Sequence, residues 1–95
     1  MPTMTDGHDS LDGLKGRVIV LDLASPYVVL GTLVSWDDRT VCLENADVHD
    51  LRTSPTTREH YVVDAKTMGI QANRARTLIT RSGVVAVAAL DDVVT

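Results

Sequence analysis

The fold is decided by residues 30–45, which read LGTLVSWDDRTVCLEN. Apolar residues dominate up to Val34, a polar WDDR segment follows at residues 36–39, and apolar residues resume at Val41. This pattern predicts two strands joined by a tight, charged turn. Gly31 lies inside the first strand, where glycine is unfavourable unless the backbone bends sharply or approaches another segment closely. A strongly bent strand is what closing a small barrel requires.

The flanking sequence predicts further strands and one short helix. Ser10 is a suitable cap for a helix over residues 11–15, and Gly16 is a suitable stop. Breaks between apolar runs separate the remaining elements. We expect strands at residues 17–23, 27–36, 40–46, 70–79 and 84–89, with a break in the fourth near Asn73.

Residues 47–69 form an inserted segment between the third and fourth strands. Thr56 and Glu59 have the spacing of a capping box, and apolar residues follow at helical spacing until Gly69. The segment is therefore interpreted as a helix. An extended conformation over residues 59–64, which contain the β-favouring run Tyr-Val-Val, is the alternative.

The length of 95 residues fits one domain, placed at residues 10–95 after a polar tail at residues 1–9 that is expected to be disordered. Aromatic residues make up 3% of the chain and phenylalanine is absent, so the core is expected to consist of Val, Leu, Ile and Ala.

The net charge of −4 argues against a general nucleic-acid coat but not against a local basic patch. The single cysteine, Cys42, has no partner within the chain for a disulfide and is expected to be a buried thiol. We find no signal peptide and no apolar run of about 18 residues. A soluble, cytoplasmic protein without a membrane partner is therefore expected.

Two segments resemble the signatures of the Sm-like protein family. The spacing from Gly31 to Asp37 to Leu43 is similar to that of the bacterial Hfq branch of this family. Residues 77–87, TLITRSGVVAV, resemble the second Sm signature, and residues 14–20 are similar to the lead-in to the first Sm strand. The expected fold is all-β: a five-stranded, strongly bent small barrel of the SH3 type, with a short N-terminal helix and an inserted segment between strands 3 and 4.

The resemblance also implies a function. In Sm-like rings the turn between strands two and three and the turn between strands four and five converge around a central pore, where they hold single-stranded RNA by stacking, hydrogen bonds and phosphate contacts. The corresponding candidate residues here are Asp37, Arg39, Thr40, Arg81 and Ser82. Asp37 is expected mainly to shape its turn through hydrogen bonds to its own backbone.

The chain departs from the family pattern at both turns. It has no Asn in the first turn, where Arg39 and Thr40 stand. It has neither the Arg-Gly step nor the Tyr-Lys-His run in the second, where residues 80–82 read TRS. A non-enzymatic RNA scaffold or chaperone is thus the first hypothesis. A structural or protein-interaction ring that has lost RNA binding, with the insertion as its partner surface, is the alternative.

Strands four and five would be the open edges of such a barrel, and uncovered apolar edges aggregate. Pairing the fourth strand of one copy with the fifth of the next removes both edges, and a head-to-tail contact of this kind closes into a ring when the rotation permits. The contact does not fix the ring size, and the resemblance to Sm-like proteins implies roughly five to seven copies. The candidate edge residues are Leu78, Ile79, Val85 and Val87. Arg74 and Arg76 share one strand face as a secondary basic surface, for RNA phosphate or for the acidic face of a neighbouring copy.

Other candidates have simpler explanations. His49, Asp50 and His60 are weak metal ligands, because their spacing matches no compact metal motif and they read as solvated loop residues. Trp36 is expected in the core at the barrel end rather than stacked on a base. No metal, cofactor or enzymatic activity is expected. A metal-dependent enzyme is the third hypothesis, after the RNA scaffold and the protein-interaction ring.

Overall fold

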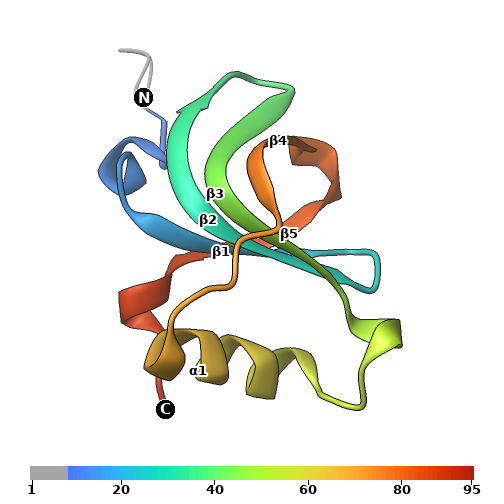
Figure 1. Cartoon of the computed structure of the whole chain (residues 1–95). Helices are drawn as coiled ribbons and strands as arrows, with labels where there is room; N and C mark the ends of the chain where they lie inside the picture. Colours follow the sequence, from blue (N-terminus) through green and yellow to red (C-terminus); the bar gives the residue numbers. More distant parts are fainter. Residues whose placement is uncertain (1–8) are drawn as a thin grey trace.

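Five antiparallel strands form one strongly curved sheet in the order β4-β3-β2-β1-β5 (Figure 1). Their bounds are β1 Val18–Leu23, β2 Tyr27–Trp36, β3 Thr40–Asp50, β4 Arg74–Thr80 and β5 Val84–Ala89. The computed structural model describes residues 9–95. The expected disordered tail therefore lies outside the described residues, apart from Asp9. The predicted five-stranded small barrel is confirmed, with one helix, α1 (Arg58–Met68), added to it.

The sheet bends where β2 and β3 come unusually close. The β2–β3 register shifts at Gly31, between Leu30 and Thr32, and Asn45 opposite it has a positive φ of 50°. A Cβ atom built on Gly31 would lie 3.0 Å from both Cα and Cβ of Ala46 and 3.3 Å from the carbonyl oxygen of Glu44. Only glycine leaves room for this bulge, as the sequence predicted for a close backbone approach.

The curved sheet has an apolar cluster on each face. Alternating side chains on each strand point to opposite sides, so Ile19 and Leu21 face the barrel interior while Val20 faces outward. Trp36 packs at the edge of the interior cluster, as predicted. The interior cluster consists of Leu11, Ile19, Leu21, Val29, Leu33, Val41, Leu43 and Ala46.

The outer cluster is built by the insertion. Val62 and Ala65 of α1 pack with outward residues of β1 and β2 and with Leu90 of the C-terminal turn η5 (Leu90–Asp92). Figure 1 shows α1 lying across this face, on the side away from the barrel. Val93 packs against the same cluster, whereas Val94 is exposed.

The helical interpretation of the insertion is correct, but its boundaries differ from the prediction. β3 continues to Asp50 instead of ending at residue 46, because residues 47–50 pair with Tyr27–Leu30 of the long β2. The inserted segment therefore starts with the turn η3 (Leu51–Thr53). Thr57, rather than Thr56, caps α1 by accepting a hydrogen bond from the His60 amide at 3.1 Å.

Gly69 ends α1 as expected. It has a positive φ of 89°, and its N–H donates to the Ala65 carbonyl at 2.8 Å. The following residues do not belong to a strand, since β4 starts at Arg74 instead of residue 70.

A buried carboxylate fastens α1 to the barrel. Asp47 on β3 is only 3% exposed. It accepts hydrogen bonds from the Tyr61 hydroxyl of α1 and, at 3.2 Å, from the Asn73 side-chain amide. Burial, together with the bond to Asp47, raises the pKa of the Tyr61 phenol well above its ordinary value. A raised pKa favours the protonated phenol, which is the form that donates to Asp47.

The N-terminal helix is a single 3-10 turn, η2 (Asp12–Leu14). The predicted cap at Ser10 is wrong, because Leu11 occupies the N-cap position and no side chain among the described residues caps η2. The Asp9 carboxylate instead accepts from the Leu11 amide, two positions along the chain, at 2.9 Å. Within residues 9–95, no helix is both long and apolar enough to cross a membrane.

Candidate nucleic-acid interface

The turn between β2 and β3 is organised by Asp37. Its Oδ1 accepts from the backbone amides of Arg39 at 2.8 Å and Thr40 at 2.7 Å, and from the Thr40 hydroxyl at 3.3 Å. These bonds lower the pKa of the Asp37 carboxyl below its ordinary value, and the bond from the Arg39 amide has the largest effect. Hydrogen-bond donors that face a carboxylate favour its charged form. The predicted turn-shaping role of Asp37 is confirmed, and Arg39 is left exposed.

The turn between β4 and β5, η4 (Arg81–Gly83), lies directly against the first turn. The Arg81 amide donates to the Arg39 carbonyl at 2.8 Å, and the Arg81 guanidinium donates to the Asp37 carbonyl at 2.7 Å. Ser82 is exposed beside them. The structure therefore brings the five predicted residues to one end of the barrel. Asp37 and Arg81, which are in contact there, are 44 positions apart in the sequence.

Arg81 also makes an ion pair that the sequence did not indicate. Its Nη1 lies 3.1 Å from Asp9 Oδ2, with side chains 28% and 30% exposed respectively. Asp9 precedes η2, so the N-terminal turn reaches the candidate interface. The only sign of this contact in the sequence is a carboxylate near the start of a short helix. Carboxylates are common at that position because they cap helices, so Asp9 does not point to a distant arginine.

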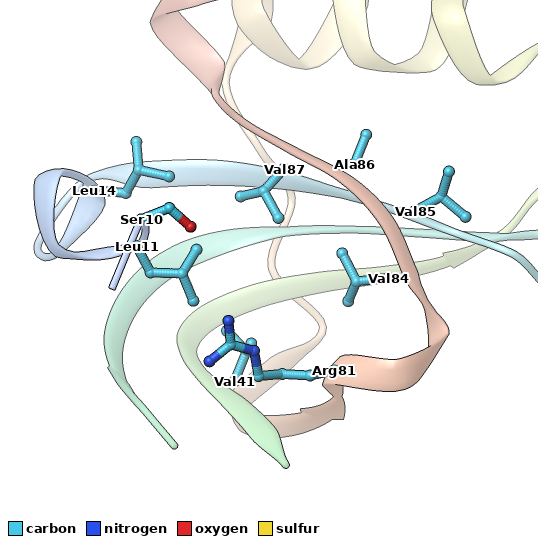
Figure 2. Close-up of a pocket in the computed structure, with 9 residues that line it drawn as sticks. All are labelled: Ser10, Leu11, Leu14, Val41, Arg81, Val84, Val85, Ala86 and Val87. Atoms are coloured by element: carbon cyan, nitrogen blue, oxygen red, sulfur yellow. The ribbon is translucent and has the colours of Figure 1, made fainter. Parts of the chain in front are cut away.

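A groove of about 400 Å³ runs from Arg81 between η2 and β5. Figure 2 shows Leu14 of η2, with Ser10 and Leu11 that precede it, on one side of the groove and the β5 valines on the other. Arg81 and Val41 also line it. In the described chain β5 is hydrogen-bonded only to β1, so its other edge is open along this groove. The lining residues are Ser10, Leu11, Leu14, Val41, Arg81, Val84, Val85, Ala86 and Val87.

The two sheet edges, β4 and β5, carry exposed apolar side chains. Leu78 on β4 is 65% exposed and Val85 on β5 is 70% exposed. The other two candidate edge residues differ, because Ile79 and Val87 turn inward and pack against the interior cluster. Exposed and inward-facing residues alternate at the end of β4, but on β5 the register with β1 shifts beside Val85, so Val85 and Val87 differ although they are two positions apart.

Arg74 and Arg76 are exposed but do not join the two-turn site. They lie near the start of β4, whereas η4 follows its end, roughly 20 Å away at 3.3 Å per strand residue. Arg76 Nε is 3.3 Å from the sulfur of Cys42, whose thiol is buried as predicted. The Arg74 guanidinium donates to the Asn73 carbonyl at 3.1 Å.

The candidate metal ligands are dispersed among structural contacts. The His49 ring stacks on Tyr61 at 3.9 Å, and its Nε2 is 3.1 Å from the Ser54 hydroxyl. Asp50 pairs with Arg52 at 3.0 Å. His60 lies 3.7 Å from an Asp64 oxygen one helical turn along. Among residues 9–95, no three His, Cys, Asp or Glu side chains are grouped so that they would hold a metal ion.

A strongly bent, five-stranded antiparallel sheet in the order β4-β3-β2-β1-β5, with its β2–β3 and β4–β5 turns in contact, is an Sm-like fold. The resemblance seen in the sequence is thereby confirmed for the fold. Among solved structures, the chain is similar to the Sm protein of Pyrococcus abyssii, determined in complex with a uridine heptamer. The TM-score is 0.58 and the identity 15%, over 86% of this chain and 99% of the other. No protein-family model matches the sequence, and no curated protein matches it.

Proposed function

We propose that this chain is a ring-forming, Sm-like module that binds single-stranded RNA as a non-enzymatic scaffold or chaperone. The observation that carries the proposal is the contact between the two turns. Hydrogen bonds from Arg81 to the carbonyls of Arg39 and Asp37 place two guanidinium groups at one end of the barrel. The exposed hydroxyl of Ser82 and the partly exposed hydroxyl of Thr40 lie with them.

These groups have the chemistry that single-stranded RNA requires. A guanidinium stacks on a base through its plane and also binds phosphate through paired N–H donors. The hydroxyl groups of Thr40 and Ser82 both donate and accept, so they are suited to base edges without fixing one base. The solved Sm protein of similar fold was determined with a uridine heptamer, which supports RNA as the ligand class.

The ring follows from the two open edges. Exposed strand edges with apolar side chains favour pairing with another strand, and β4 and β5 lie at opposite ends of the sheet order. Antiparallel pairing of β4 from one copy with β5 of the next matches the other strand pairs and uses the groove beside β5. Because the two surfaces differ, the contact is head-to-tail and closes into a ring, for which the Sm-like resemblance implies roughly five to seven copies. Repetition then presents one two-turn site per copy to successive nucleotides, which raises the overall affinity.

β4 of one copy and β5 of the next can pair only if residues on the same face of the sheet lie side by side. Ile79 and Val87 must both face the interior, so Leu78 falls on the outer face with Ala86 and Ala88. The small side chains of the two alanines leave room for Leu78. Antiparallel pairing also brings the start of β4 to the end of β5, so Arg74 approaches the acidic turn η5 of the next copy. This gives Arg74 and Arg76 a role at the copy–copy contact rather than on RNA.

The test is binding of fluorescent heptamers of uridine and adenosine, followed by anisotropy at low salt. The wild type is expected to bind at least one of them, with an affinity that falls as salt rises. Arg39→Ala and Arg81→Ala should each weaken binding roughly tenfold or more, because each removes one charged contact per copy. Arg52→Ala, at the far end of β3, is the matched control and should change the affinity less than about twofold.

The protein-interaction ring remains the second candidate, supported by the net charge of −4 and by the carboxylate already on Arg81. In that case α1 and η5 would form the partner surface. An oligomeric wild-type protein that binds neither heptamer at low salt would overturn the RNA proposal and favour this candidate.

A further inference from the structure

We propose that Asp9 is a built-in competitor for RNA phosphate at Arg81, so that the N-terminal turn regulates the two-turn site. This inference rests on the proposed function. It starts from an ion pair at that site, between Asp9 Oδ2 and Arg81 Nη1 at 3.1 Å. A carboxylate oxygen and a phosphate oxygen are the same kind of acceptor for a guanidinium, so the two compete for the same donors.

Asp9 is held in place without help from Arg81. Its Oδ1 accepts from the Leu11 amide at 2.9 Å, and its carbonyl accepts from the Asp12 amide at 2.9 Å. Its own amide donates to Asp12 Oδ2 at 3.2 Å. The two carboxylate oxygens thus have separate partners, since Oδ1 accepts from the Leu11 amide and Oδ2 pairs with Arg81. Releasing Arg81 leaves the bond to the Leu11 amide intact.

Arg81 is likewise positioned by other bonds. Its guanidinium donates to the Asp37 carbonyl at 2.7 Å and its amide to the Arg39 carbonyl at 2.8 Å. These bonds do not involve Asp9, so the arginine remains aimed at the same place when the carboxylate leaves. Both side chains of the ion pair are about 30% exposed. A pair with this exposure is weak and screened by salt, so an incoming phosphate can displace it.

Asp9 therefore weakens the binding of a single phosphate more than the binding of a long strand. A single phosphate must replace a carboxylate that is already in position, so the exchange yields little binding free energy. A strand that meets several copies of the site at once replaces several carboxylates together, and its contacts add. Asp9 therefore favours extended single strands over free nucleotides.

The test uses Asp9→Asn, because asparagine keeps an oxygen for the Leu11 amide and removes only the charge. We expect about fivefold tighter binding of the fluorescent uridine heptamer at low salt, and a change of less than about twofold when Arg81→Ala is also present. Asp38→Asn is the matched control. It removes the same charge from the neighbouring exposed turn, and its small effect should be the same with and without Arg81.

A second measurement does not depend on RNA. Phenylglyoxal modifies accessible arginines, and peptide mass spectrometry locates the modified residue. Asp9→Asn should speed modification of Arg81 several-fold relative to Arg39 in the same protein. Unchanged modification of Arg81 would overturn the inference, whatever RNA does.

The outcomes separate the inference from the proposed function. If the wild type binds RNA through Arg81 and Asp9→Asn binds equally well, the inference is wrong and the function stands. If neither protein binds RNA, the proposed function fails and the competition with it. Tighter binding by Asp9→Asn that persists without Arg81 indicates a general charge effect and also contradicts the inference.

Discussion

Gly31 determines how closely two strands approach at the bend of the barrel. The backbone of β3 bulges toward it at Asn45, and the space that a side chain would need is already occupied by Ala46. The neighbours are backbone atoms and a short side chain, which have no flexible end to move aside. The close approach therefore depends on the absence of a single carbon atom.

Gly31→Ala should destabilise the protein by about 1–3 kcal/mol, because the new methyl group forces the β3 bulge to shift. Urea unfolding monitored by Trp36 fluorescence measures the change. Gly13→Ala is the control, since a Cβ there has nothing within 4 Å, and it should leave the free energy of unfolding nearly unchanged. Equal stability of the two variants would show that the bulge adapts freely.

Asp50 contributes a pH-dependent contact at the start of η3. The side-chain hydrogen bond from Arg52, and then the bond from the Arg52 amide, lower the pKa of Asp50 from 3.8 to about 2. A lowered carboxyl pKa stabilises the fold above the unfolded value, and this contribution is lost as the pH falls from about 4 to about 2.

Asp50→Asn removes the charge, so wild type should melt at a higher temperature than the variant at pH 7. The difference should shrink between about pH 4 and pH 2, as the carboxylate becomes protonated in the wild type. Circular dichroism melts at stepped pH values measure it. A difference that stays constant to pH 2 would contradict the assigned cause.

Single residues could be predicted from sequence where their partners are local. Asp37 bonds amides two and three positions away, and the turn chemistry of aspartate indicates this directly. The Asp9–Arg81 contact joins residues 72 positions apart, so no local pattern indicates it. It depends on how η2 closes the end of the barrel.

Among the elements, α1 depends most on a polar contact with the barrel. Val62 and Ala65 supply its buried apolar face, which is narrow, and Tyr61 joins it to the buried Asp47. His49 stacks on the same ring. A short helix is marginal alone, so these contacts with β3 decide whether it forms.

Tyr61→Phe should destabilise the protein by about 1–3 kcal/mol, because Asp47 loses a donor while it stays buried. The ring stack on His49 is retained, so the loss isolates the hydroxyl. Hydrogen exchange should increase across α1 more than across β1. Tyr27→Phe is the control for loss of a phenol elsewhere. Unaltered protection of α1 would mean that the hydroxyl does not anchor the helix.

The bounds of the elements were predictable where apolar runs and breakers coincide. β2 and β5 have the expected limits because turns border both sides. The end of β3 was missed, since residues 47–50 alternate polar and apolar side chains and resemble a loop. Their strand conformation depends on pairing with β2, which is a tertiary effect. The helix cap was misplaced by one residue because Thr56 and Thr57 are adjacent.

For the whole molecule, the important feature is a sheet with two unfinished edges. The sequence predicted both edges but not which residues are exposed, because the direction of each side chain depends on the register with β3 and β1. Leu78 and Val85 are exposed, whereas Ile79 and Val87 are partly buried on the interior side. A chain that leaves such edges open in solution is prone to aggregate.

Leu78→Lys should dissociate the assembly without unfolding the subunit, because the lysine replaces an exposed leucine at the proposed contact. Met68→Lys is the control, since Met68 is 77% exposed but lies on α1 rather than on an edge. Light scattering should report a subunit mass for the first variant and an unchanged assembly for the second. Identical masses for both variants would place the contact elsewhere.

The association of identical copies through β4 and β5 is the claim on which RNA binding by a pore depends. Multi-angle light scattering of the wild-type protein at working concentrations tests it most directly. The mass should be a single multiple of the 10.3 kDa of one chain, as head-to-tail closure requires, and the Sm-like resemblance implies roughly five to seven copies. A stable species of 10.3 kDa that stays soluble would contradict it.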